Sequence, residues 1–259
     1  MRSRILVVAL TILLAIAAHS QTYSENTLYI FGSSATDGSY PFGDLVLDAA
    51  GNFYGTTWSG GGSPNCSPYS GCGTVFKLDS SGNETILHTF TGGSDGAGPV
   101  ASLTRDGEGN LYGTTSAGGI STHYAGGAGT VFRITAAGEY SILHMFGANP
   151  SDGAAPRGSL TLDGRGTLYG TTTAGGSYGK RTVFKLRANE RETVLYSFRG
   201  KVDGAYPGTN LLRDGVGNLY GTANQGGNFG VGVRACEELI RGVRHESRCT
   251  KSEFRYRSG

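Results

Sequence analysis

The chain contains one short pattern four times, and this repetition constrains the fold more than any other feature. The heptad Gly-Asn-Phe-Tyr-Gly-Thr-Thr stands at residues 51–57, and close copies begin at residues 109, 166 and 217. Three other marks accompany it in constant order: an Asp-Gly-x-x-Pro segment that we expect to be a loop, a Thr-Val-Phe segment and an apolar run ending in Phe. A period of roughly 50 residues is typical of a chain that builds one supersecondary unit repeatedly.

Each unit is predicted to form four short antiparallel strands, which in the first unit are residues 44–48, 54–57, 74–78 and 86–90. Glycine-rich turns such as Asp-Ala-Ala-Gly-Asn separate them, and 45 glycines supply the positive φ that such turns require. Four strands in about 50 residues is the kelch-like spacing of a propeller blade. Such a blade buries its apolar faces only against neighbours. We therefore predict an incomplete, all-β, propeller-like array of about three and a half four-stranded blades over residues 21–232.

The two ends of the chain differ from the repeats. Arg2 and Arg4 precede an apolar run in residues 1–20, which predicts a secretory signal peptide, with an uncleaved anchor as the alternative. Residues 27–31 resemble a lone fourth strand that would help to close a ring. After residue 232 the pattern stops, and residues 233–259 form a basic, non-repeat tail. The tail is either a natural binding extension or the product of a frameshift or truncation, and the third strand of the last blade is expected to be missing.

The formal net charge of +2 conceals a slightly acidic central segment. Both ends carry an excess of positive charge, so residues 21–233 are negative overall. They show no lysine and arginine stripe of the kind that binds nucleic acid, so nucleic acid is excluded as the expected partner. With the signal removed, no stable membrane span is expected, and the predicted location is extracellular or at the cell surface.

Taken together, the four marks resemble the tandem repeats of the GloVer type, the choice-of-anchor repeat proteins of exported bacterial systems. The resemblance covers roughly residues 27–232. It implies an extracellular, propeller-like protein with a variable C-terminal anchor. It implies no catalytic residues, and no C-terminal sorting anchor is recognisable in this chain.

Several residues are candidates for chemistry. Cys66 and Cys72 lie in one variable loop, which in an exported protein predicts a local disulfide, with free thiols as the alternative. His88 and His144 recur at one position, but Tyr196 replaces them in the third unit, so a common packing role is favoured over a ligand or base. The repeated aspartates are weak calcium candidates, and their alternative role is to bond the backbone of their own turns. They are Asp37, Asp95, Asp152 and Asp203.

The expected function is a binding or surface-interaction module without catalytic residues or cofactor, because near-identical repeats assemble no nucleophile and base. The expected partner is a polysaccharide or a cell-envelope protein. Aromatic residues on the variable loops and on the connections between blades are the predicted ligand-binding set. They are Trp58, Tyr69, Tyr124, Tyr178, Tyr40 and Tyr206. The alternatives are an exported propeller enzyme acting on glycans, as hydrolase or lyase with two carboxylates, or a non-functional gene fragment.

Overall fold

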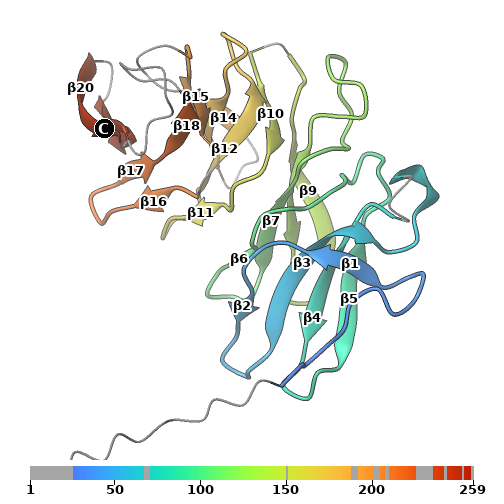
Figure 1. Ribbon diagram of the computed structural model, residues 1–259. Helices are drawn as coiled ribbons and strands as arrows, with labels where there is room; N and C mark the ends of the chain where they lie inside the picture. Colours follow the sequence, from blue (N-terminus) through green and yellow to red (C-terminus); the bar gives the residue numbers. More distant parts are fainter. Residues whose placement is uncertain are drawn as a thin grey trace, which may run out of the picture.

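The computed structural model describes residues 26–66, 71–149, 151–187, 192–200, 205–207, 210–225, 236–241, 244–252 and 254–257. Within these ranges every regular element is a β-strand, apart from one turn of 3-10 helix, η1 (Pro64–Cys66). The predicted signal segment 1–20 lies outside the described residues. Figure 1 shows the sheets following one another in chain order, which confirms an all-β array of propeller-like blades.

The first three blades have the same antiparallel order. The first blade contains β1 (Gly38–Pro41), β2 (Val46–Leu47), β3 (Phe53–Gly60), β4 (Thr74–Leu78) and β5 (Glu84–Thr89). The second contains β6 (Thr104–Arg105), β7 (Leu111–Thr115), β8 (Thr130–Ile134) and β9 (Tyr140–Met145). The third contains β10 (Gly153–Pro156), β11 (Thr161–Leu162), β12 (Leu168–Gly175), β13 (Thr182–Leu186) and β14 (Glu192–Ser197).

The Asp-Gly-x-x-Pro segments, expected to be loops, are strands in two of these blades. β1 pairs with the far half of β3, and β10 pairs with β12 in the same register. In the second blade the contact is a single bridge between Ala97 and Ala117. The residue before each proline has a positive φ, 57° at Tyr40, 60° at Gly98 and 51° at Ala155. In β1 and β10 this left-handed residue lies inside the strand, because Pro41 still pairs with Thr57 and Pro156 with Thr172.

The turn between the first and second strands is organised by one aspartate in each blade. These aspartates are Asp48, Asp106, Asp163 and Asp214. In the second blade the Asp106 carboxylate accepts hydrogen bonds from the backbone N–H groups of Glu108 (3.0 Å) and Asn110 (2.8 Å). The Asn110 amide (2.8 Å) and the Tyr112 hydroxyl (3.0 Å) also donate to it. The Asn and Tyr of the repeated heptad are thus partners of this turn.

The Asp106 turn predicts a pH-dependent contribution to stability. Burial raises the pKa of Asp106, but the hydrogen bonds from Asn110, Tyr112 and Glu108 outweigh it and hold the pKa below its ordinary value. A lowered pKa means that the carboxylate stabilises the fold above about pH 4, and that this stabilisation is lost as the pH falls through the folded-state pKa. We expect Asp106→Asn to lower the free energy of unfolding by about 1 kcal/mol at pH 7.

Urea unfolding of the variant and the unaltered chain at pH 7 and pH 3 measures this difference. The difference in unfolding free energy should narrow as the pH falls through the lowered pKa of Asp106, because protonation gives the unaltered turn a neutral side chain like that of the variant. Glu139→Gln, at an exposed carboxylate, is the control and should change little at either pH. A difference that stays the same at both pH values would contradict the assigned role of the ionised Asp106.

The apolar core lies between consecutive blades. One cluster joins Val75 and Phe90 of the first blade to Leu111 and Phe132 of the second. Two similar clusters join the second blade to the third and the third to the fourth. The ring of Phe90 lies 5.4 Å from that of Phe132, centroid to centroid. The equivalent pair Phe146 and Phe184 is 5.1 Å apart. The phenylalanine that directly follows β5 or β9 therefore packs on the third strand of the next blade.

The N-terminal segment follows the same packing rule without forming the predicted strand. Residues 26–30 have no regular structure. Nevertheless, Phe31 lies 4.8 Å from Phe76, ring centroid to centroid, as Phe90 does from Phe132. Phe31 thus takes the position of the terminal phenylalanine of a fourth strand, but residues 26–30 do not form the strand itself.

A second contact crosses the first two seams and also joins the N-terminal segment to the first blade. One partner lies two residues before the terminal phenylalanine of a fourth strand or of the N-terminal segment. The other partner is the first residue of the fourth strand in the next blade. The pairs are Tyr29 with Glu84, His88 with Tyr140, and His144 with Glu192. The Tyr29 hydroxyl donates to Glu84 (2.8 Å), and His88 stacks on Tyr140 with centroids 3.7 Å apart. Burial, together with the nearby Asp152 carboxylate, raises the pKa of Glu192 to about 7.

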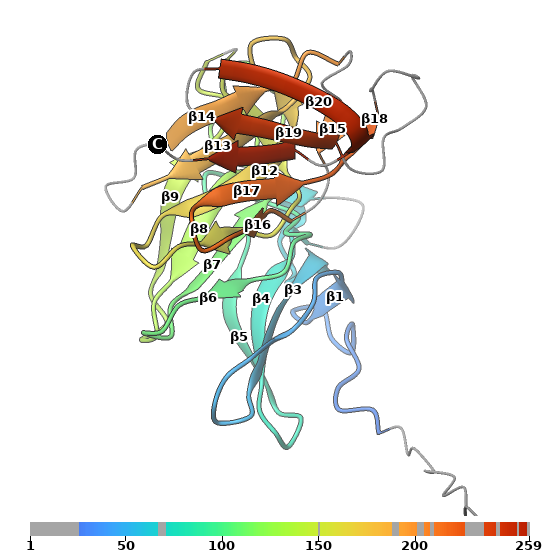
Figure 2. The same ribbon diagram turned by 90° about the vertical axis from the view of Figure 1, so that its left-hand side faces the viewer.

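The fourth blade combines repeat strands with strands of the C-terminal segment. They are β15 (Ala205–Pro207), β16 (Leu212–Arg213), β17 (Asn218–Gly221), β18 (Ala223–Gln225), β19 (Cys236–Arg241), β20 (Arg244–Ser252) and β21 (Phe254–Arg257). β15 pairs with β18, and the other strands form a sheet in the order β16, β17, β21, β19, β20 (Figure 2).

β21 occupies the place of the third strand, which was expected to be missing. It pairs antiparallel with β17 and sets Phe254 opposite Gly221, just as β4 sets Phe76 opposite Gly55. The segment Phe-Arg-Tyr-Arg alternates with a period of two, as a strand requires. β19 then runs parallel to β21, a pairing that the first three blades do not use.

Candidate functional site

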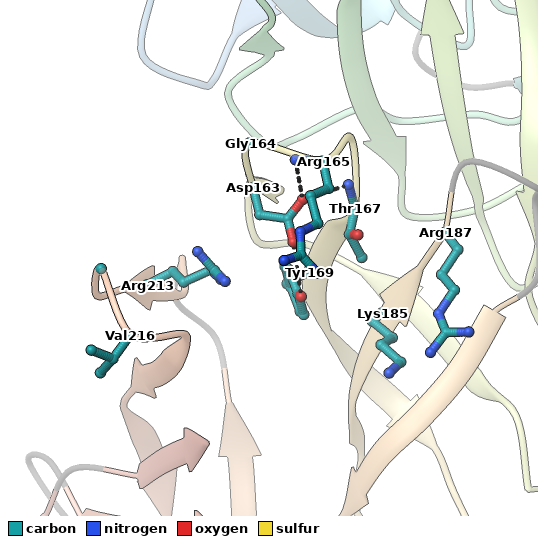
Figure 3. A pocket seen from close by; sticks show the side chains of 10 residues that line it. Asp163, Gly164, Arg165, Thr167, Tyr169, Lys185, Arg187, Arg213 and Val216 are labelled. Carbon is teal, nitrogen blue, oxygen red and sulfur yellow. Dashed lines mark hydrogen bonds between the residues drawn. The ribbon is translucent and has the colours of Figure 1, made fainter. Parts of the chain in front are cut away.

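An open cleft of about 730 Å³ lies at the seam between the third and fourth blades. Its walls come from the turn between β11 and β12, from the end of β13, and from β16 with the turn that follows it. Figure 3 shows Arg213 and Val216 on one side of the cleft and Lys185 and Arg187 on the other. The cleft therefore lies at the short turns, and the aromatic set predicted from the sequence lies on other loops.

Hydrogen bonds of the aspartate turn shape the floor of the cleft. Asp163 accepts bonds from the backbone N–H groups of Arg165 and Thr167, both 2.9 Å, and from the Tyr169 hydroxyl at 3.2 Å. Tyr169 is only 7% exposed, and the guanidinium of Arg213 lies 5.9 Å from its ring centroid. Hydrogen bonds thus hold the Asp163 turn and Tyr169 together, whereas the side chains of Arg165 and Arg187 are exposed to solvent.

The charge of the cleft is strongly positive. Four cationic side chains line it, and none forms an ion pair with a described acidic side chain. They are Arg165, Lys185, Arg187 and Arg213. Burial raises the pKa of Asp163, but its hydrogen bonds from Thr167, Arg165 and Tyr169 and the charge of Arg213 bring the pKa below its ordinary value. Its single negative charge leaves an excess of positive charge in the cleft.

This concentration of charge is confined to one seam. The positions of Arg165, Lys185, Arg187 and Arg213 are occupied by Ala50, Lys77, Asp79 and Arg105 at the seam between the first and second blades. At the seam between the second and third blades they are occupied by Glu108, Arg133, Thr135 and Leu162. Residues that only stabilise the scaffold would recur at every seam. Arg165 and Arg187 occur at neither of the other two seams, and this departure from the repeat favours a binding role here.

Two of the aromatic residues predicted for binding do lie together. The rings of Tyr40 and Trp58 are in edge-to-face contact, with centroids 6.1 Å apart. Tyr40 is 62% exposed, and the indole of Trp58 lies against Gly98 of the next blade.

The structure does not join the other predicted aromatics to this pair. Tyr124 is half-buried and packs over Gly147 at the edge of an apolar cluster. Tyr178 is 52% exposed, and the guanidinium of Arg199 lies 5.2 Å from its ring centroid. Tyr69 and the side chain of Tyr206 lie outside the described residues.

The aspartates considered for calcium are engaged by their own loops. Asp37 accepts the Ser33 backbone N–H (2.9 Å), and Asp95 accepts the Thr91 N–H (2.9 Å). Asp152 accepts the Gly147 N–H (2.9 Å) in the same way. These are the bonds of a turn-stabilising carboxylate. Asp203 lies outside the described residues.

Cys66 and Cys72 are joined by a disulfide, with their Cα atoms 5.1 Å apart. Cys72 is 1% exposed and belongs to the core between the first two blades. Both sulfur atoms face Gly92, where an added Cβ would meet them at 2.7 and 2.8 Å. The disulfide thus ties the loop after β3 to the seam.

Within the described residues, the structure contains no helix of the length and apolar character needed to cross a membrane.

Comparison with solved structures finds similar folds at low identity. A virginiamycin B lyase from Staphylococcus aureus is 17% identical with a TM-score of 0.48, over 75% of this chain and 52% of that one. A putative 6-phosphogluconolactonase from Bacteroides uniformis is 17% identical with a TM-score of 0.44, over 74% and 52%. A gluconolactonase from Xanthomonas campestris is 17% identical with a TM-score of 0.43, over 70% and 56%. The chain thus spans about half the length of these structures.

No curated protein matches the chain in sequence. The profile of the Gloeobacter/Verrucomicrobia repeat, in contrast, matches residues 67–234, which hold most of the repeated strands and the cleft. With the four sequence marks and the matching blades, this places the chain in the Gloeobacter/Verrucomicrobia repeat family.

Proposed function

We propose that the protein is an exported binding module whose cleft between the third and fourth blades holds an acidic, carboxylate-bearing polysaccharide. The observation that carries the proposal is the group of four cations without ion-pair partners among the described residues. Guanidinium groups bind carboxylates through paired hydrogen bonds, and such charge-assisted bonds are stronger than neutral ones. A repeating uronic acid would supply carboxylates along the cleft.

The surroundings of the cleft support a binding role. Hydrogen bonds to Asp163 hold the backbone of the turn that carries Arg165, which lowers the backbone entropy that this turn loses on binding. Val216 is 68% exposed at the rim and offers an apolar contact to a sugar ring. A nucleic acid would need a longer basic stripe than one seam provides.

Export is part of the proposal. The disulfide between Cys66 and Cys72 supports it, because disulfides persist in oxidising compartments outside the cytosol. The paired arginines and apolar run of residues 1–20 agree with it.

Titration with polygalacturonate, a carboxylated polysaccharide, tests the proposal. We expect the purified full chain to bind it and the double variant Arg165→Gln, Arg187→Gln to bind roughly tenfold to a hundredfold more weakly. Binding should weaken as the salt concentration rises, because solvent-exposed charges are screened. Uncharged dextran should not bind.

The repeat supplies a matched control. Lys77→Gln, Arg105→Gln removes two cations at the equivalent seam of the first two blades and should leave the affinity unchanged. If the unaltered chain fails to bind, or both double variants lose affinity equally, the cleft is not the site.

Trp58→Ala tests the aromatic alternative in the same titration. If the Trp58→Ala variant keeps its affinity for polygalacturonate, the result supports the cleft as the binding site. Loss of affinity in this variant, with full binding by Arg165→Gln, Arg187→Gln, would place the site at the Tyr40 and Trp58 pair and overturn the proposal.

A further inference from the structure

A cluster of metal-ligand type crosses the seam between the second and third blades, and none of its residues lines the cleft. His144 lies on β9, Asp152 directly precedes β10, and Glu192 begins β14. One ligand atom from each side chain lies within 4.8 Å of the other two. The three residues come from three segments of the chain, so the fold itself brings them together.

Two atoms of this cluster are buried without a hydrogen-bond partner among the described residues. They are Nε2 of His144 and Oε1 of Glu192. The Nε2 atom lies 3.6 Å from Oδ2 of Asp152, which is longer than a hydrogen bond. A buried polar atom without a hydrogen-bond partner destabilises the folded chain, so the arrangement calls for another partner.

At the seam between the first two blades, the side chains at the equivalent positions contact one another and need no ligand. Its residues are His88, Asp95 and Tyr140. His88 stacks on Tyr140 and lies 3.3 Å from Asp95, and the Tyr140 hydroxyl donates to the Asp95 backbone carbonyl at 2.6 Å. Glu192 stands where Tyr140 stands in that seam, so His144 has no ring on which to stack and faces a carboxylate instead.

We propose that His144, Asp152 and Glu192 bind a zinc ion that joins the second and third blades. Zinc takes imidazole and carboxylate ligands at about 2.0–2.2 Å, usually in a tetrahedron, whose edges are then roughly 3.4 Å. The 3.6 Å separation of the His144 and Asp152 ligand atoms is close to that edge. Calcium is less suited, because its ligands are oxygen atoms and one of the three here is an imidazole nitrogen.

Neighbouring groups hold two of the ligands in place. The Asp152 carboxylate accepts the backbone N–H groups of Gly147 (2.9 Å) and Gly153 (2.8 Å), which orient it toward His144. The imidazole of His144 is held edge-to-face against Phe146, with centroids 4.7 Å apart. Outer contacts of this kind set the orientation of metal ligands and their affinity.

Calorimetric titration of the metal-free full chain with zinc chloride tests this site. We expect one zinc ion to bind per chain and the melting temperature to rise with zinc, because the ion binds the folded state. Glu192→Gln and His144→Gln should each lower the affinity by at least about tenfold, since each removes one of three ligands. His88→Gln, at the equivalent position of the preceding seam, is the matched control and should bind zinc as the unaltered chain does.

Glu192→Tyr is a second variant that distinguishes loss of zinc binding from loss of folding. It places the residue of the preceding seam at this position, where it can stack on His144, so it should fold and fail to respond to zinc. The proposal is overturned if the unaltered chain binds no zinc, if Glu192→Tyr folds and binds zinc with unchanged affinity, or if His88→Gln loses as much affinity as His144→Gln.

Discussion

We expect Phe132→Ala to lower the free energy of unfolding by about 3–5 kcal/mol, the usual cost of removing a buried phenylalanine ring. Phe132 is fully buried, and its ring contacts both Phe90 across the seam and Tyr140. The substitution therefore leaves a cavity between two blades that cannot move together without disturbing their own ladders. Guanidinium chloride unfolding followed by circular dichroism measures the effect.

Ile120→Ala is the control for this experiment. Ile120 is 68% exposed, so its truncation should change the free energy of unfolding by no more than about 0.5 kcal/mol. Equal losses in the two variants would mean that the seams do not carry the stability of the array.

Gly113→Ala is the second substitution for which we expect a large loss, about 1–3 kcal/mol or more from overpacking. An added Cβ at Gly113 would lie 2.4 Å from Cζ of Phe132 and 2.9 Å from its Cε1. Phe132 is confined on both sides, so the ring cannot retreat. The glycine after the repeated tyrosine is therefore required by the phenylalanine that covers it, as it is for Gly55 under Phe76 and Gly170 under Phe184.

Another glycine of the same blade provides the control. Gly107 lies in the exposed turn, an added Cβ there would meet nothing within 4 Å, and its φ is not in the left-handed region. Gly107→Ala should leave the stability unchanged or raise it slightly, because alanine restricts the unfolded chain. Thermal unfolding of both variants distinguishes a packing requirement at Gly113 from a general preference for glycine. If Gly113→Ala melts like Gly107→Ala, the packing explanation is wrong.

Sequence alone determined the elements that depend on local rules. The heptads marked the second strands, the Thr-Val-Phe segments marked the third strands, and the glycine-rich turns were correctly placed between them. These features are local because backbone conformation and the alternation of side chains follow from a few neighbouring residues. For the same reason the repeat pattern was sufficient to indicate the family to which the chain belongs.

The predictions were wrong for segments whose structure depends on pairing with another strand. The Asp-Gly-x-x-Pro segments were expected to be loops, but the far half of the second strand offers unpaired backbone groups, and β1 and β10 satisfy them. Residues 254–257 carry no repeat mark, yet they pair with β17 because that strand also requires a neighbour. Hydrogen bonding between strands distant in sequence is not visible in local composition.

The tertiary structure alone decided which side chains meet across the seams. Arg165, Arg187 and Arg213 belong to different strands and turns. The departure of Arg165 and Arg187 from the repeat was visible in the sequence, but it carried no meaning until the cleft brought these side chains together. His144 and Tyr196 occupy equivalent positions, which favoured a common packing role from the sequence. The structure sets His144 against Glu192 of the following blade, so its chemistry depends on a residue 48 positions later. The repeated sequence determines the strands and turns within each blade. The side chains that meet at a seam depend on both of the blades that form it.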